Sequence, residues 1–168
     1  MFAKLEYEWY TLDDAHTAAL YASRAVFPYL LVGNVRDACK SFKLFTNRLV
    51  EANNSLGVQD ISGESSDLRI YPSLPLLNFL NLLLLAVQKG SADLFRQLKT
   101  NYAAQLNEVN GWDEALTSVA EMYFSIQRPR QGNPLLDMIG SMFGGGAGPA
   151  KPQPKRVGGS TPVAEGLD

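Results

Sequence analysis

The most apolar stretch of the chain lies at residues 74–87 and reads LPLLNFLNLLLLAV. A membrane-spanning helix needs about 20 apolar residues, whereas this stretch is shorter and is interrupted by Asn78 and Asn81. Pro75 stands in the first helical turn, where its missing N–H costs nothing, and Gly90 follows as a stop signal. The stretch therefore predicts a helix buried inside a helical protein, with no direct insertion into a membrane.

The segments around this helix show apolar residues three and four positions apart, which is the spacing of one helical face. Val35, Ala38 and Phe42 are an example. The cations of the same segment are expected on its solvated side, and they are Arg36, Lys40, Lys43 and Arg48. The pattern predicts helices over residues 13–32, 34–53, 73–89, 92–107, 112–127 and 134–143.

Residues 57–71 break the helical pattern. The polar run Gly-Glu-Ser-Ser separates two short runs with strand propensity, which predicts a β-hairpin. The apolar positions of the two runs are Val58, Ile61, Leu68, Ile70 and Tyr71. Because an isolated hairpin is only marginally stable in water, this one must rest on its own helices or on a partner.

Two turns of the chain share one pattern, an apolar helix followed by a glycine and a polar residue that caps the next helix. They are Gly33-Asn34 and Gly90-Ser91. Without the hairpin insertion the two turns are about 40 residues apart, which is the period of paired-helix solenoids. The sequence therefore predicts an all-α fold over residues 1–143: a right-handed α-solenoid of antiparallel, tetratricopeptide-like helix pairs with one inserted β-hairpin.

The two ends of the chain differ in what they can bury. Phe2, Leu5, Trp9 and Tyr10 place an apolar patch at the start, which we expect to be exposed and to promote self-association. Residues 144–168 are rich in glycine, proline and charge. Such a composition buries too little apolar surface to offset the entropy of ordering, so a disordered tail is predicted.

The composition favours a binding protein over an enzyme. The net charge of −2 and the pI of about 5.4 indicate no basic surface of the kind that nucleic acids select. His16 is the only histidine, and Cys39 adjoins the apolar face of its helix, where a buried structural thiol is expected. Asp13 and Asp14 are expected to be acids at a helix N-terminus. The residues predict no catalytic site, no metal and no cofactor, and the single cysteine and lack of a visible targeting signal favour the cytosol.

Four blocks of the sequence are similar to a known family and occur in the family's order. They read YLLVGNVRDA at 29–38, YPSLPLLNFL at 71–80, ADLFRQL at 92–98 and FSIQRPRQGNPLLDMIGSMF at 124–143. Over residues 1–143 the chain resembles the Golgi-to-ER traffic protein four family. The resemblance implies a cytosolic α-solenoid adaptor in the pathway that delivers tail-anchored membrane proteins to the endoplasmic reticulum.

The resemblance also implies partners. The C-terminal half of a family member holds the N-terminal segment of a ubiquitin-like-domain protein, and a hairpin between helices takes part. The N-terminal half contacts the targeting ATPase. Family members are longer than this chain and the part without a counterpart is N-terminal, so contact with the ATPase is expected only where that half is present.

We expect the partner site where the hairpin approaches the last helix. The hairpin is too small to be stable alone, and the last helix has more apolar sides than its neighbours can cover. Two alternatives remain: these residues cap the solenoid, or the chain is a generic helical-repeat subunit of another assembly, such as a tetratricopeptide or proteasome-lid-like scaffold. The predicted site residues are Val58, Ile61, Leu68, Ile70, Tyr71, Leu135, Leu136, Met138, Ile139 and Phe143.

Overall fold

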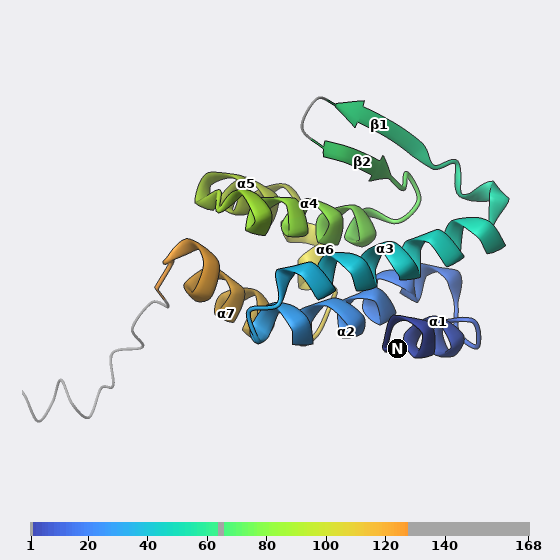
Figure 1. The fold of residues 1–168 in the computed structure, drawn as a ribbon, viewed down its shortest axis with the longest axis horizontal. Helices are drawn as coiled ribbons and strands as arrows, with labels where there is room; N and C mark the ends of the chain where they lie inside the picture. Colours follow the sequence, from blue (N-terminus) through green and yellow to red (C-terminus); the bar gives the residue numbers. More distant parts are fainter. Residues whose placement is uncertain (1, 64–65, 128–168) are drawn as a thin grey trace, which may run out of the picture. The chain divides into compact units, whose positions relative to one another are not determined.

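The chain consists of packed helices with one two-stranded sheet inserted between them (Figure 1). The computed structural model describes residues 2–63 and 66–127. Its α-helices are α1 (Phe2–Tyr10), α2 (Ala18–Leu31), α3 (Val35–Ala52), α4 (Pro75–Lys89), α5 (Ala92–Asn101), α6 (Ala103–Asn107) and α7 (Trp112–Phe124). Two short 3₁₀ helices, η1 (Ala15–Thr17) and η2 (Asn54–Leu56), precede α2 and the sheet. The sheet consists of β1 (Gln59–Gly63) and β2 (Ser66–Ile70), so the predicted all-helical fold with one hairpin is confirmed.

Two turns of identical design set the helix pairs. Gly33 and Gly90 follow α2 and α4 with φ of 79° and 61°, in the left-handed region that favours glycine. The N–H of the next residue, Asn34 or Ser91, donates to a carbonyl near the end of the helix at 2.8 and 3.1 Å. The side chain of that residue then accepts an N–H of the following helix, at 3.1 and 3.2 Å. Because the turns are short, α3 returns along α2 and α5 returns along α4.

The core surrounds α2, which packs against α1, α3, α4 and α7. The buried face of α2 is rich in alanine, which lets its neighbours approach closely. The apolar stretch at 74–87 forms α4 and is buried as predicted, with Leu77, Phe79 and Leu80 at 0% exposure. No helix within the described ranges combines the length and apolar character that crossing a bilayer requires.

Several predicted boundaries were wrong. Residues 2–10 form helix α1, which the sequence analysis did not predict. The helix predicted over residues 13–32 begins later, because α2 starts at Ala18 after the short 3₁₀ helix η1. The predicted helix 92–107 is interrupted at Tyr102, whose ring packs on Phe79 at 5.6 Å. The predicted helix 134–143 and the predicted tail 144–168 lie outside the described residues.

Helix α1 has two apolar faces. Its inner face places Tyr10 at 6% exposure against the ring of Phe45, with centroids 5.8 Å apart, so the prediction that Tyr10 is exposed was wrong. Its outer face leaves Phe2, Leu5 and Trp9 between 40% and 59% exposed, as predicted.

Candidate partner-binding surface

The hairpin is attached to α4 through two asparagine side chains. Asn78 is buried, and its amide makes two hydrogen bonds to the main chain of Tyr71: Oδ1 accepts from the N–H at 2.7 Å and Nδ2 donates to the C=O at 2.9 Å. Asn81, one turn later on the same helix, donates to the carbonyl of Arg69 at 3.1 Å. The carbonyl of Arg69 at the outer edge of β2, and the main chain of Tyr71 just after the strand, are therefore bound by side-chain amides where a third strand would otherwise pair.

A second set of polar contacts links the hairpin to α3. The guanidinium of Arg69 donates to Asp60 across the ribbon at 2.8 Å and to Asn47 of α3 at 2.9 Å. The hydrogen bond to Asp60 raises the pKa of Arg69, which stays charged at every physiological pH. The guanidinium thereby links both strands to α3, and the Asp60 carboxylate and the Asn47 amide oxygen accept hydrogen bonds from its N–H groups.

Between the hairpin and helices α3 and α4 lies a groove of about 530 Å³, which we call the hairpin groove. Figure 1 shows the hairpin beside these two helices, with β2 nearer to α4 than β1. The helices run antiparallel, because Cys39 near the start of α3 meets Gln88 near the end of α4 at 2.9 Å. The lining residues on the helices are Cys39, Phe42, Lys43, Thr46, Asn47, Asn81, Leu84, Leu85 and Gln88, and those on the hairpin are Asp60, Ile61, Leu68, Arg69 and Tyr71.

The strand register decides which side chains share a face of the ribbon. Ile61 is opposite Leu68, and Asp60 is opposite Arg69. Because successive side chains in a strand alternate, the Ile61–Leu68 pair lies on one face and the Asp60–Arg69 pair on the other. Residues of both pairs are among those that line the hairpin groove. Ile61 is 53% exposed and is the most accessible apolar side chain there.

The structure distributes the predicted site residues unevenly. Ile61 and Leu68 line the hairpin groove, Ile70 is half-buried in β2, and Val58 is half-buried against the core just before β1. Tyr71 is 1% exposed, because its ring belongs to the core, so it does not offer a free surface to a partner. The C-terminal half of the predicted site lies outside the described residues, and comprises Leu135, Leu136, Met138, Ile139 and Phe143.

Sequence reasoning missed the polar residues that build the groove. Asn78 and Asn81 had appeared only as interruptions of an apolar stretch, although two asparagines three positions apart on a buried helix already indicate a specific hydrogen-bonding role. Cys39 was expected to be buried, yet it is half-buried in the groove wall. Burial raises the pKa of the Cys39 thiol, which therefore stays protonated and weakly nucleophilic at neutral pH.

The titratable groups elsewhere make local structural contacts. Asp13 accepts hydrogen bonds from the N–H of Asp14 at 2.8 Å and from the hydroxyl of Tyr21 at 2.9 Å, and the first of these contributes most to lowering its pKa. Within residues 2–63 and 66–127, no group of three or more histidine, cysteine, aspartate or glutamate side chains is arranged to hold a metal ion.

Three comparisons identify relatives of the chain. The family model described as Golgi to ER traffic protein 4 matches residues 1–143. Golgi to ER traffic protein 4 of Aspergillus fumigatus is 66% identical over 144 residues, and its counterpart in Schizosaccharomyces pombe is 29% identical over 146 residues. The crystal structure of C. therm. Get4 superposes with a TM-score of 0.73 at 61% identity and covers 92% of this chain.

The chain spans less than half of these longer proteins. The match covers 42% of the Aspergillus protein, 46% of the Schizosaccharomyces protein and 49% of the crystallised chain. The activities and partners of a whole relative therefore reach this chain only as proposals.

Proposed function

The chain belongs to the Golgi to ER traffic protein 4 family, and on this premise we propose that it is a non-enzymatic helical adaptor in the delivery of tail-anchored membrane proteins to the endoplasmic reticulum. In this proposal it acts in the cytosol, needs no cofactor, and holds the N-terminal segment of a ubiquitin-like-domain protein in the hairpin groove. In this proposal the targeting ATPase is contacted by the part of the longer relatives that has no counterpart in this chain.

The observation that carries this proposal is the hairpin groove itself. A hollow of about 530 Å³ is of the size that takes side chains of a partner segment. Its lining mixes polar side chains with the buried residues Phe42 and Leu84, and Ile61 is exposed at its border. A lining and border of this kind suit a segment that alternates apolar and polar side chains.

The free edge of β1 offers a second docking element. The carbonyl of Arg69 points away from β1, because it accepts from Asn81 of α4. Asp60 is opposite Arg69, so its own N–H and C=O point away from β2. In the described part of the chain nothing pairs with this edge. An extended partner segment is therefore able to add to β1 as a further strand.

The test is calorimetric titration of this chain with the N-terminal segment of a ubiquitin-like-domain protein from the same organism. The proposal expects the segment to bind and the variant Ile61→Asp to weaken binding at least about tenfold, because a charge at the border of an apolar contact is poorly solvated. Met122→Asp is the matched control, since Met122 on α7 is 51% exposed and Ile61 is 53% exposed. Equal affinities for the two variants would show that the groove is not the partner site.

A further inference from the structure

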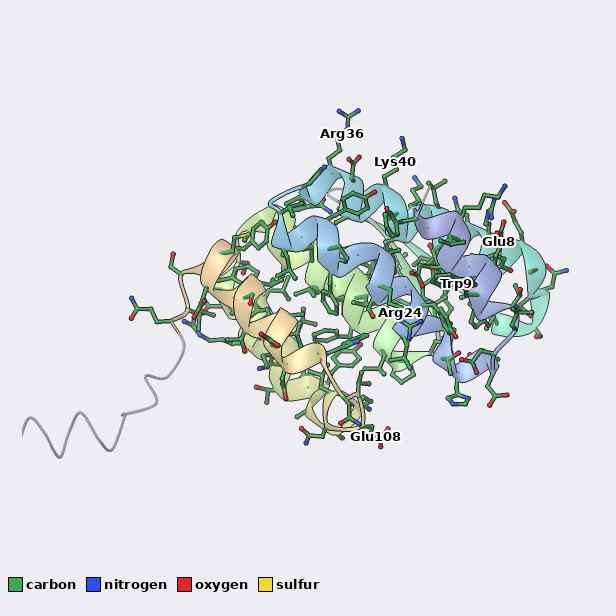
Figure 2. All side chains as sticks on the ribbon, turned by 90° about the horizontal axis from the view of Figure 1, so that it is seen from below. Glu8, Trp9, Arg24, Arg36, Lys40 and Glu108 are labelled. Atoms are coloured by element: carbon green, nitrogen blue, oxygen red, sulfur yellow. The ribbon has the colours of Figure 1, made fainter. Side chains whose placement is uncertain are left out.

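Three cations follow one another along the solvent face of α3, and we call Arg36, Lys40 and Lys43 the basic stripe. All three are exposed, and Lys43 also lines the hairpin groove. Figure 2 shows Arg36 and Lys40 projecting from α3 side by side into solvent. At a rise of 1.5 Å per residue the stripe is about 10 Å long, so it runs beside the groove for two turns of the helix.

The cations of the basic stripe are not neutralised by ion pairs in the part of the chain that the structure describes. Three cations elsewhere have close neighbours: Lys4 pairs with Glu8, Arg96 pairs with Asp93, and Arg48 lies over the ring of Tyr7. The stripe residues form no ion pair with a described carboxylate, and the nearby Asp37 is bound by the side-chain amide of Asn34 at 2.8 Å. The positive charge is local, since the whole chain carries a net charge of −2.

The arrangement opposes the preferences of an isolated helix. Like charges three and four positions apart repel, and both spacings occur between Arg36, Lys40 and Lys43. Arg36 also stands in the first turn of α3, where the helix dipole disfavours a cation. Local preferences that are violated without a compensating contact are typical of a functional surface.

We propose that the basic stripe binds a run of acidic residues in the segment held by the hairpin groove. This inference rests on the proposed function for the identity of the partner, but it adds the chemistry that selects the segment: apolar side chains for the groove, with aspartate or glutamate beside them. An extended segment covers the length of the stripe in about three residues. Leu44, which is 49% exposed on the same helix, gives this surface an apolar neighbour.

The first experiment uses a hexaglutamate peptide, which probes the stripe without the natural partner. Nuclear magnetic resonance titration of the full chain is expected to shift the backbone amides of α3 and to show weaker binding as salt is added. The triple variant R36Q/K40Q/K43Q is expected to bind about tenfold more weakly, because three exposed ion pairs are lost.

The matched control is K4Q/R96Q/K99Q, which removes the same number of positive charges at positions that do not line the groove. Equal affinity of the two triple variants for hexaglutamate, or shifts that lie outside α3, would overturn the inference. Glutamine is a good helix former, so the stripe variant is expected to stay folded, and circular dichroism checks this. The single variant K43Q removes one of the three charges and is expected to bind hexaglutamate about twofold more weakly.

The second experiment separates this inference from the proposed function. The ubiquitin-like-domain segment is titrated into the parent, the stripe variant and the control variant. If the parent and the stripe variant bind it equally, the acidic run is not what the stripe recognises, while the adaptor proposal stands. If the parent does not bind it, the adaptor proposal fails and the hexaglutamate result alone decides whether the stripe is an acidic-peptide site.

Discussion

The hairpin and helix α1 both expose apolar side chains, but the hairpin is attached mainly by polar contacts and α1 by aromatic packing. Ile61 on the hairpin is 53% exposed and Trp9 on α1 is 49% exposed. The hairpin is held by amide side chains that grip its main chain, from Asn78 and Asn81 of α4. Helix α1 is held by its own aromatic side chains, since Tyr7 and Tyr10 pack on the ring of Phe45.

The difference shows how an element keeps its side chains available. A hairpin that is anchored through its backbone does not need Ile61 or Leu68 for its attachment, so both remain free for the groove. An element that is anchored through its side chains buries one full face against the protein. Helix α1 does so, and only its opposite face is available to a partner. Each of the following substitutions tests this contrast.

The largest loss of stability is expected from Tyr10→Ala. The ring of Tyr10 is 6% exposed and lies within 6.1 Å of the rings of Tyr7, Tyr21 and Phe45. Removing it leaves a cavity that should lower the free energy of unfolding by about 3 kcal/mol. Urea denaturation measures this, and Trp9→Ala is the neighbouring control with an expected loss below about 1 kcal/mol. Similar losses of stability for the two variants would contradict the conclusion that α1 packs through its Tyr10 face and leaves its Trp9 face exposed.

A smaller loss is expected from Asn78→Leu. Leucine has the same branching at Cγ but leaves the buried N–H of Tyr71 without a partner, which should cost about 2 kcal/mol. The C=O of Tyr71 loses the amide of Asn78 but keeps the N–H of Leu74 at 3.1 Å. Asn81→Leu removes a single, partly exposed bond to the carbonyl of Arg69, and about 1 kcal/mol is expected. Amide exchange at Tyr71 should accelerate in the first variant only. A more stable Asn78→Leu protein would mean that apolar packing, and not the amide, attaches the hairpin.

A small gain is expected from Glu6→Gln. Glu6 is 5% exposed on the inner side of α1, and its Oε2 has no hydrogen-bond partner among the residues described. Burial raises the pKa of this carboxyl above its ordinary value of 4.5, and the charge of Arg24 opposes the shift only partly. The folded state therefore binds the proton more tightly than the unfolded state, so stability present at low pH is lost as pH rises through the raised pKa.

Glutamine mimics the protonated carboxyl at every pH. The urea midpoint of the Glu6→Gln variant should therefore exceed that of the parent at pH 7 and match it near pH 4. A variant that is less stable than the parent at pH 7 would indicate that the charge on Glu6 is stabilised by its surroundings, contrary to this account.

The smallest effect on stability is expected when the outer face of α1 is made polar. Leu5→Gln together with Trp9→Gln should change the free energy of unfolding by no more than about 0.5 kcal/mol, since both side chains are exposed. The same pair should reduce self-association of the chain at high concentration, as sedimentation velocity will show. Unchanged sedimentation relative to the parent would mean that this face does not drive association.

The sequence predicted those elements whose signals are local. The helices that contain residues 35–52 and 75–89 have one clear apolar pattern and strong caps, and the hairpin has a polar turn between two short runs. The break at Tyr102 has no glycine or proline to announce it and depends on packing against Phe79. Helix α1 was missed because apolar residues on two faces obscure the usual amphipathic pattern.

Of the candidate site, the hairpin and its apolar border were predictable, but the groove was not. The groove depends on contacts between residues far apart in sequence, such as Arg69 with Asn47 and Cys39 with Gln88. Tyr71 was assigned to the surface because its neighbours in sequence are strand residues, whereas its alternation in the chain turns it into the core. The basic stripe was recognised as a charged face, and the absence of a described ion pair to its cations gives it significance.

The hydrogen bonds from Asn78 to the main chain of Tyr71 affect how the hairpin can evolve. Hydrogen bonds to backbone groups do not depend on which side chains the bound segment carries. Substitutions at Ile61 and Leu68 can therefore accumulate without loosening the hairpin, provided that Asp60 and Arg69 keep their contacts. A lineage can drift toward a new binding specificity at these positions while the helices beneath stay constant. For protein engineers the same property makes the hairpin a site for new recognition residues, as long as Arg69 and Asp60 are retained.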